Sequence, residues 1–533
     1  MKSHQLMRIG AILFFLGLIF LFIAWRFTYP IHITESNDIT FTQFSVLVWP
    51  GLLFSLMGLF FVGYYSERKG IKAICASLFP VILYVYVFYF SYPPTSDSGA
   101  VKSMFEVFHH INADSSVIPY FQYPSYFTLN EITMQISGIY VNDVAHIFFA
   151  LYGVLLGLFL YLFLFKETKN DSYQIGLIAV FLYFTTSFSY LNYQWVPQTL
   201  ALVFFFILLI TFNREGLQYK LINFVLFTAL VFTHSFIPVI FLLFFGLYCF
   251  KKREQRHMFI IMACIFLSVL IFYTTYYFPQ IVAAFKETIY GLGEYTIELS
   301  RSFKDTTGFF DQFLSLINRI RIPLTFGVVS IGFLILLIKK KISHNVTILG
   351  IVGVCYLFVG MMYPVLGLRA LQVLIAALVL GIGFFIVKQK KLTVAFVFVI
   401  VLLSIFGPMR SSYDQTQFLV SEEEHSLQFL ATTISDSNRS KIVVDQVMWG
   451  YFSNIDNYLN PKHTIALRPS KPEFYEIFNL SIDRNNYVVY DTNLIKEIKG
   501  WGFVEDNSTI YSKVVLVNNK IYQCGKTSIL TGT

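Results

Sequence analysis

The chain has 533 residues, of which 56% are hydrophobic and only 13% are charged. Soluble domains have about 45–50% apolar and about 25% charged residues, so this composition excludes an ordinary water-soluble protein. The formal net charge of +8 does not indicate nucleic-acid binding, because the Lys and Arg residues lie in short segments between apolar blocks. The composition is that of an integral membrane protein.

Apolar blocks of the length that a membrane requires, about 20 residues, recur from Ile9 to Phe406. The first block is longer than a signal-peptide core and ends at Trp25-Arg26-Phe27 without a small-residue cleavage site, so we expect a retained span. The sequence predicts about thirteen spans, near 9–25, 44–65, 73–92, 144–165, 174–190, 196–212, 221–233, 236–250, 258–277, 323–338, 346–362, 371–387 and 392–406.

Residues 221–250 allow two interpretations, one long tilted helix or two short helices joined at the polar turn 233–235. Cytoplasmic segments collect Lys and Arg. With a cytoplasmic N-terminus and two helices, the predicted inside segments contain 19 Lys and Arg residues and the outside segments 8. A single helix would move the basic run 251–256 to the outside. We therefore expect two helices, and an extracytoplasmic C-terminal tail.

The chain changes character after Phe406, which divides it into a transmembrane domain, 1–406, and a soluble domain, 407–533. In the tail, Lys-Ile-Val-Val-Asp at 441–445 predicts a buried strand with a helix after it, and 487–490 and 513–517 predict further strands. We expect a small α/β or α+β domain. Cys524 is the cysteine of the tail and the other four lie in apolar spans, which excludes a disulfide framework or metal cluster and leaves the state of Cys524 open.

Two predicted outer loops are long, 93–143 and 278–322, and long loops are commonly functional. Asp97 lies near the start of the first loop. A carboxylate at a boundary between membrane and water can have its pKa tuned for general-base catalysis; the alternative is that Asp97 caps the helix predicted after it. Arg369 ends a span on the outer side, where its guanidinium can hold a phosphate through two parallel hydrogen bonds or extend to the interface.

The first loop has a characteristic order of features: an Asp-Ser-Gly turn, an amphipathic helix, a Tyr-Pro segment at 123–124, another helix and a Gly-Ile step at 138–139. This order resembles the GT-C superfamily of membrane glycosyltransferases, which includes the oligosaccharyltransferases and protein mannosyltransferases. The resemblance implies that Asp97 is catalytic and that the helices after it lie on the membrane. It also implies that His234 faces the outer cavity, with a satisfied histidine at a helix junction as the alternative.

Other features of the chain depart from the resemblance. The matching loop lies further along the chain than in better-known members, where it follows the first span, and the Trp-Trp-Asp-Tyr-Gly signature of oligosaccharyltransferases is absent. Metal-dependent members use a pair of carboxylates. A divalent metal is therefore left open, with these candidates for a second carboxylate or metal ligand: Glu106, Asp114 and Glu131.

The resemblance implies an inverting glycosyltransferase in the plasma membrane that uses a sugar on a polyprenyl phosphate or diphosphate. Asp97 would be the base, and Arg369 and His234 would bind the donor phosphate. The acceptor would be a glycan, a lipid or a protein. Candidates for stacking on sugar rings are Tyr123, Tyr126 and Trp195.

Three alternatives remain. A polymerase or ligase of lipid-linked glycans with another fold is disfavoured by the soluble tail. A secondary transporter is disfavoured because the spans are almost free of charge and show no repeat. The third alternative is a non-catalytic membrane scaffold.

Overall fold

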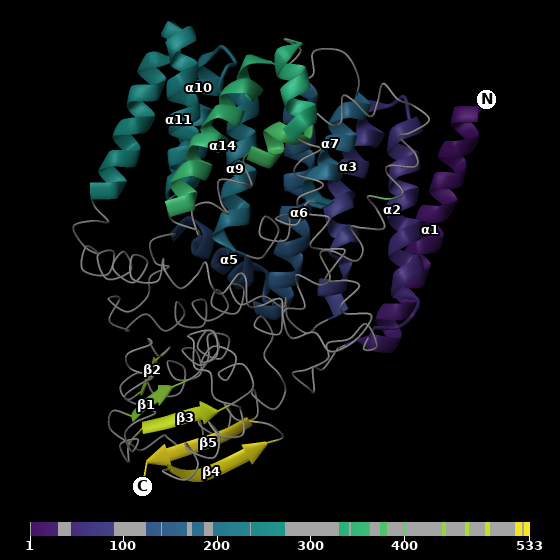
Figure 1. Ribbon diagram of the computed structural model, residues 1–533, viewed down its shortest axis with the longest axis vertical. Helices are drawn as coiled ribbons and strands as arrows, with labels where there is room; N and C mark the ends of the chain where they lie inside the picture. The colour runs from purple at the N-terminus through teal and green to yellow at the C-terminus, as the bar shows by residue number, and fades with distance from the viewer. Residues whose placement is uncertain are drawn as a thin grey trace.

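The structure is a computed structural model of the chain, and helices dominate its first half (Figure 1). The residues that it describes are 2–29, 44–89, 124–139, 141–167, 173–185, 196–234, 236–271, 330–339, 343–362, 374–380, 399, 440–443, 464–467, 486–490, 518–524 and 527–532. The labelled helices are α1 (Lys2–Thr28), α2 (Val48–Tyr65), α3 (Lys69–Leu83), η2 (Val85–Tyr89), α5 (Pro124–Ser137), α6 (Val141–Glu167), α7 (Tyr173–Thr185), α9 (Pro197–Thr211), α10 (Leu217–Val231), α11 (Phe236–Lys251), η5 (Arg253–Gln255) and α14 (His344–Met362).

Apolar helices occupy most of the predicted spans that the structure describes. Four of them are long and apolar enough to cross a membrane: Ser3–Thr28, Val48–Tyr65, Asp143–Glu167 and Arg253–Ile271. Shorter apolar helices are Gln174–Thr185, Pro197–Thr211, Leu217–Val231, Phe236–Lys251 and His344–Cys355. Within the described residues, these nine helices overlap nine of the predicted spans. The span predicted at 73–92 differs, because α3 ends at Leu83 and a 3-10 helix, Val85–Tyr89, follows it. The total of thirteen spans stays a prediction.

Residues 221–250 form two helices, as the charge distribution predicts. α10 ends at Val231 and α11 begins at Phe236. At the junction, Thr233 Oγ1 donates to the Ala229 carbonyl (2.6 Å). The hydroxyl of Thr233 therefore has a hydrogen-bond partner in the last turn of α10. The two-helix prediction is confirmed.

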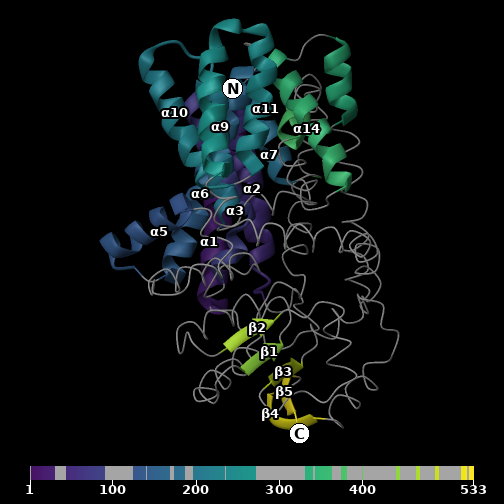
Figure 2. The same cartoon turned by 90° about the vertical axis from the view of Figure 1, so that its left-hand side faces the viewer.

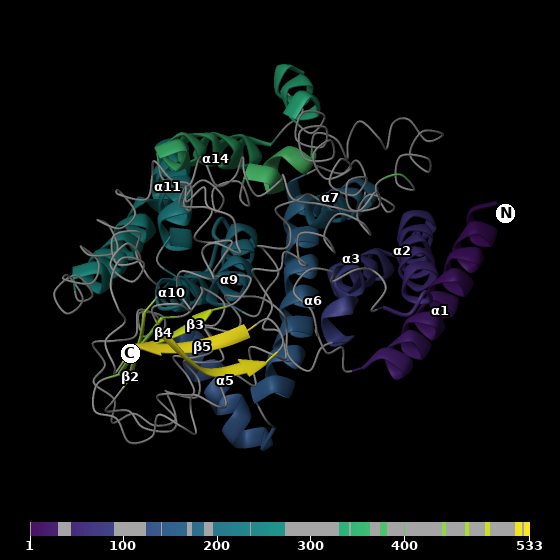
Figure 3. The same cartoon turned by 60° about the horizontal axis from the view of Figure 1, so that its bottom comes forward.

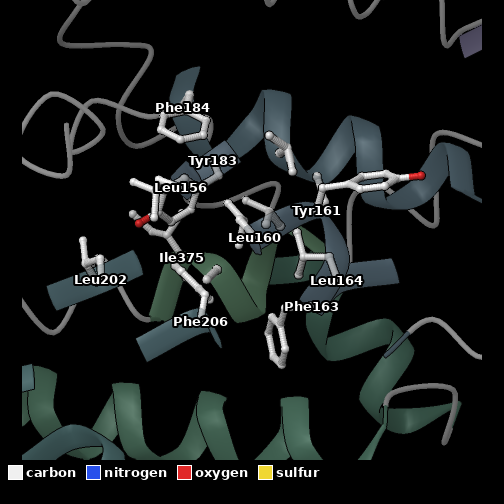
Figure 4. Packing of buried hydrophobic residues seen from close by; sticks show 14 of the residues in the cluster. Leu156, Leu160, Tyr161, Phe163, Leu164, Tyr183, Phe184, Leu202, Phe206 and Ile375 are labelled. Carbon is white, nitrogen blue, oxygen red and sulfur yellow. The ribbon is translucent and has the colours of Figure 1, made fainter. Parts of the chain in front are cut away.

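α6 is the centre of the helical part, with α3 and α9 on either side of it in Figure 3. Its buried face consists of large apolar residues that meet α7, α9 and residues 374–380 (Figure 4). Phe206 of α9, for example, lies 6.0 Å from Phe163 and 6.5 Å from Tyr183, measured between ring centroids. Such side chains pack α6 against α9 and α9 against α7.

A glycine sets the closest approach between α3 and α6. Pro80 has no N–H, so the carbonyl of Ala76, four residues before it in α3, has no helical donor from that position. Gly157 of α6 lies against this carbonyl, and a Cβ at Gly157 would be only 2.4 Å from the Ala76 oxygen. The missing side chain is therefore a requirement of this packing.

Hydrogen bonds join helix ends that the sequence assigns to the cytoplasmic side. Gln174 Nε2 donates to the Tyr64 carbonyl (3.2 Å), which joins the start of α7 to the end of α2. Lys166 Nζ donates to Asn213 Oδ1 (2.6 Å), which joins the ends of α6 and α9. The carboxylate of Glu167 accepts hydrogen bonds from the start of α14. These contacts place the joined helix ends side by side, while the side of the membrane on which they lie stays a prediction.

Five described strands form one mixed sheet, in the order β2-β1-β3-β5-β4. β1 pairs in parallel with β2 and β3, and β5 pairs antiparallel with β3 and β4. The strands are β1 (Ser440–Val443), β2 (Thr464–Leu467), β3 (Asn486–Tyr490), β4 (Asn518–Cys524) and β5 (Thr527–Gly532).

The sheet confirms the strands predicted near 441–445 and at 487–490, and it adds β2, β4 and β5, which the sequence does not predict. The predicted strand 513–517 lies outside the described residues. Figures 1 and 2 both show the sheet beyond the end of the helices that carries α5, with the N-terminus of α1 at the other end. The boundary of a soluble domain at 407 and its side of the membrane stay predictions.

Candidate functional site

Three candidate residues belong to the described chain. Tyr126 and Glu131 lie on α5, and His234 lies at the junction of α10 and α11. The other candidates lie outside the described residues: Asp97, Glu106, Asp114, Tyr123, Trp195 and Arg369.

α5 is the helix that the sequence predicts between the Tyr-Pro segment and the Gly-Ile step. Gly138 follows its last residue with φ +67°, and the Gly138 N–H donates to the Met134 carbonyl (2.8 Å). A glycine in this left-handed conformation is a common helix end. The helix predicted before the Gly-Ile step is confirmed, and Gly138 ends it.

The exposed side of α5 carries three aliphatic side chains together with Thr128, Gln135 and Ser137. Leu129, Ile132 and Ile136 are 40%, 48% and 82% exposed, and their spacing places them on one side of the helix. In water, three such side chains would be unfavourable, because burying an aliphatic side chain contributes about 1.5–3 kcal/mol. Exposed aliphatic side chains on one side of a helix suit a position in the membrane interface, which stays a prediction for α5.

The buried face of α5 includes polar groups. Asn130 is fully buried and donates from Nδ2 to the Tyr126 carbonyl (2.7 Å), and Glu131, 6% exposed, accepts at Oε1 from Gln135 Nε2 (2.8 Å). The buried side of α5 carries an amide and a carboxyl group beside three apolar side chains, Tyr126, Phe127 and Met134. This face therefore brings polar groups to the inside of the protein.

α5 rests on the starts of α6 and α9 through a small apolar cluster. From α5 it contains Tyr126, Phe127 and Met134, which pack against Val144, Ala145, Phe148, Tyr152, Val196 and Leu200. The ring of Tyr126 meets Phe127 edge-on, with centroids 5.5 Å apart, and lies 6.3 Å from Tyr152. Tyr126 is fully buried, so a sugar would reach its ring only if this packing opened. Its role in stacking stays a prediction.

His234 is buried at the start of α11, with 5% of its surface exposed. Its Nδ1 accepts a hydrogen bond from the Phe236 N–H (3.1 Å), one of the N–H groups that the first turn of a helix leaves without a partner. An imidazole that accepts at Nδ1 has its proton on Nε2. His234 thus stabilises the helix junction through Nδ1 and keeps Nε2–H as a donor, which suits either role that the sequence allows.

α5 and the turn with His234 meet directly. The Ser125 N–H donates to the Phe232 carbonyl (3.3 Å), which joins the first turn of α5 to the residues before His234. The structure therefore brings two of the predicted segments, more than one hundred residues apart in sequence, to the same end of the helices.

The described residues hold no cluster of three or more His, Cys, Asp or Glu side chains that is suited to a metal ion. Of the candidate carboxylates, Glu131 alone lies among them, and its Oε1 already accepts from Gln135. A single carboxylate supplies at most two oxygens, which falls short of the several oxygens that Mg²⁺ or Ca²⁺ requires. The metal requirement stays open.

Sequence reasoning missed two polar residues of this end. Asn130 lies four residues after Tyr126 and four before Met134, a spacing that places all three on one face of a helix. This spacing could have indicated that Asn130 is buried with the two apolar residues. His146 lies in the first turns of α6, and its ring centroid is 5.7 Å from that of Phe88. The latter contact joins residues far apart in the chain, so no local pattern indicates it.

No family model and no curated protein matches the sequence. Two solved structures of an archaeal oligosaccharyltransferase resemble the structure. One is the Archaeoglobus fulgidus enzyme tethered to an acceptor peptide with the NVT sequon, at a TM-score of 0.46. The other is AglB from Archaeoglobus fulgidus with an inhibitory peptide and a dolichol-phosphate, at a TM-score of 0.48.

Both neighbours are 14% identical to this chain, and each match covers 80% of this chain and 70% of the neighbour. Oligosaccharyltransferases are members of the superfamily that the first outer loop resembles. A likeness at these values leaves the activity to be argued from the residues of this chain.

Proposed function

We propose that the protein is a membrane glycosyltransferase, which transfers a sugar from a polyprenyl phosphate or diphosphate to an acceptor at the extracytoplasmic face. The donor is an amphiphile with a long apolar tail and an anionic head group. An enzyme that uses such a donor needs apolar helices to hold the tail and polar groups at the helix ends to bind the head group. The described residues include apolar helices and polar groups at the helix ends.

The observation that carries the proposal is the arrangement of α5. It exposes aliphatic side chains, buries Asn130 and Glu131, and is hydrogen-bonded at Ser125 to the turn that contains His234. A helix that lies in the membrane interface with its polar side inward is suited to cover a site for a lipid head group. The class of reaction, sugar transfer, comes from the resemblance of the preceding loop to the GT-C superfamily.

In the proposed reaction, the acceptor hydroxyl attacks the anomeric carbon from the side opposite the phosphate, so the configuration inverts. Asp97 takes the proton of the hydroxyl as the new C–O bond forms. The bond between the anomeric carbon and the phosphate oxygen breaks, and its electron pair leaves with the phosphate. His234 Nε2–H and the guanidinium of Arg369 stabilise the charge that develops on that oxygen.

The described residues disfavour a transporter. Their buried charged side chains are Lys72, Glu131 and Glu167, and each lies outside the predicted spans. Transporters hold ionisable groups near the middle of the membrane, where substrate and coupling ions bind. Charge at the ends of the helices is instead what chemistry on a lipid head group requires.

The test is a comparison of Asp97→Asn with wild-type protein in transfer from a lipid-linked sugar. Asn caps a helix about as well as Asp, so the helix predicted after Asp97 should survive, while loss of a general base lowers the rate by about 10²–10⁴-fold. The matched control is Asp143→Asn, the same change at an exposed acidic residue in the first turn of α6, which should leave the rate unchanged.

The two readings of Asp97 make opposite predictions. If Asp97 is only a cap, Asp97→Asn transfers sugar like wild type, and Asp97→Ala is less stable by about 1 kcal/mol. Full activity of Asp97→Asn would remove the catalytic assignment. Thermal unfolding of the same purified samples separates lost chemistry from lost structure.

A further inference from the structure

η2 (Val85–Tyr89) is the last described segment before the first outer loop, and Asp97 follows Tyr89 after eight positions in the sequence. Two side-chain hydrogen bonds tie this segment to α1. The Tyr89 hydroxyl donates to the Leu21 carbonyl (2.8 Å), and Trp25 Nε1 donates to the Phe88 carbonyl (3.0 Å). One bond runs in each direction, and Leu21 and Trp25 are one helical turn apart, so the segment is held at two points.

Ring contacts complete the attachment. Phe44, just before α2, packs edge-on against Tyr89 with centroids 5.7 Å apart. On the other side, the ring of Phe88 lies 5.7 Å from His146 and 5.9 Å from Phe149, both in α6. Tyr89 is only 1% exposed. η2 is thereby fixed between α1 and α6.

α1 is itself held rigidly against α2. A Cβ at Gly17 would be 2.4 Å from the backbone nitrogen of Ser55, and a Cβ at Gly58 would be 2.4 Å from the backbone nitrogen of Phe14. Helices this close cannot slide past each other without a steric clash. The pair therefore gives the hydrogen bonds at Leu21 and Trp25 a fixed base.

The outer face of α1 is unlike a packed core helix. Its large apolar side chains Ile12, Phe15 and Phe22 are 67%, 64% and 65% exposed, as expected of a face that meets lipid. α1 packs on α2 along its length and reaches η2 at its C-terminal end. Besides its packing on α2, α1 therefore makes a further contact, which is with η2.

We infer that Tyr89 and Trp25 are positioning residues for sugar transfer: through η2 they fix the point from which the chain enters the loop that contains Asp97. The inference rests on the proposed function. A general base must lie within hydrogen-bond reach of the proton that it takes, and a misplacement of about 1 Å can slow a reaction about 10²-fold. The pair α1–α2 thus acts on the chemistry through the backbone at Tyr89.

The test is Tyr89→Phe, which removes the hydroxyl and keeps the ring against Phe44. We expect kcat to fall about tenfold, within the range for a small misplacement of a reacting group. The KM for the lipid-linked donor should stay within about twofold, because the donor's own contacts are unchanged. Trp25→Phe removes the other hydrogen bond and should lower kcat in the same way.

Tyr161→Phe is the matched control. Tyr161 is a buried residue of α6 whose hydroxyl has no hydrogen-bond partner among the described residues, and in Figure 4 its ring points away from the other labelled side chains. The control removes a hydroxyl without removing a described hydrogen bond. Its kcat should equal that of wild type.

Each outcome decides the inference. If wild type transfers sugar and Tyr89→Phe has a lower thermal midpoint but an unchanged kcat per folded molecule, the contact is structural and the inference is wrong, while the proposed function stands. If wild type transfers no sugar from any lipid-linked donor, the proposed function and the inference fail together. A lower kcat for both Tyr89→Phe and Trp25→Phe, with normal Tyr161→Phe, supports it.

Discussion

Glu167 at the end of α6 is the residue whose replacement should damage the helical part most specifically. Its side chain is buried, and its two oxygens accept hydrogen bonds from Ser343 Oγ and from Asn345 Nδ2, the latter at 3.0 Å. Ser343 Oγ in turn accepts from the Val346 N–H (3.3 Å) and so caps α14. One carboxylate therefore joins α6 to the start of a helix 176 residues further along the chain.

The expected loss follows from these bonds. A hydrogen bond to a charged group contributes about 1.5–3 kcal/mol, and a carboxylate near a helix N-terminus adds about 0.3–1 kcal/mol. Such contributions are not additive when the groups share partners, so we expect Glu167→Ala to lower the free energy of unfolding by about 3 kcal/mol. Glu167→Gln keeps one acceptor oxygen and should lose about 1 kcal/mol.

The assay is unfolding of the detergent-purified variants by heat and by denaturant, with Glu254→Ala as control. Glu254 forms an ion pair with Lys252 at 3.6 Å, but its side chain is 66% exposed, and exposed pairs contribute about 0–1 kcal/mol. Equal stability of Glu167→Ala and Glu254→Ala would show that the burial of Glu167 and its bonds to α14 contribute nothing.

Three further predictions concern packing, the donor site and the tail. Gly157→Ala should lower the stability by about 1–3 kcal/mol, because its Cβ would be 2.4 Å from the Ala76 oxygen, whereas Gly70→Ala, with nothing within 4 Å, should leave the thermal midpoint unchanged or higher. Arg369→Lys should weaken binding of the lipid-linked donor by about 1–3 kcal/mol, and unchanged donor binding in Arg369→Ala would leave Arg369 an interface anchor. A reporter fused at Asn460 should be active only if it functions outside the cytoplasm; activity of a cytoplasm-only reporter there would contradict the predicted topology.

The sequence predicted those helix boundaries that are determined by residues close to the boundary itself. The polar turn at 233–235 and the basic run after Phe250 were sufficient to divide 221–250 into α10 and α11. The Tyr-Pro segment and Gly138 marked the two ends of α5. In each case the signal lies within a few residues of the feature that it predicts.

The contacts that hold the candidate site together join residues that are far apart in the sequence, and the sequence did not predict them. The bond from Tyr89 to Leu21 spans 68 residues, and the bond from Ser125 to Phe232 spans 107. Their backbone acceptors carry no mark in the sequence, since every residue has a carbonyl. β2 was missed for a related reason, because a four-residue strand is stabilised by pairing with β1 rather than by its own composition.

The burial of polar groups on α5 also required the structure. By residue type alone, Asn130 and Glu131 would be expected at a surface, and Leu129 and Ile132 in a core. The structure buries the first two side chains and leaves the other two 40% and 48% exposed. Hydrophobicity alone does not give the direction in which a helix at a membrane surface turns its polar side.

The most direct test of the proposed function is turnover of a defined polyprenyl-linked sugar by the purified wild-type protein in lipid vesicles, with the configuration of the product determined. We expect release of the polyprenyl phosphate or diphosphate, with an acceptor-linked sugar whose anomeric configuration is opposite to that of the donor. Retention of the donor's configuration would contradict the single-displacement reaction assigned to Asp97. An absence of turnover with every donor and acceptor class tested would contradict the assignment of the protein as a glycosyltransferase.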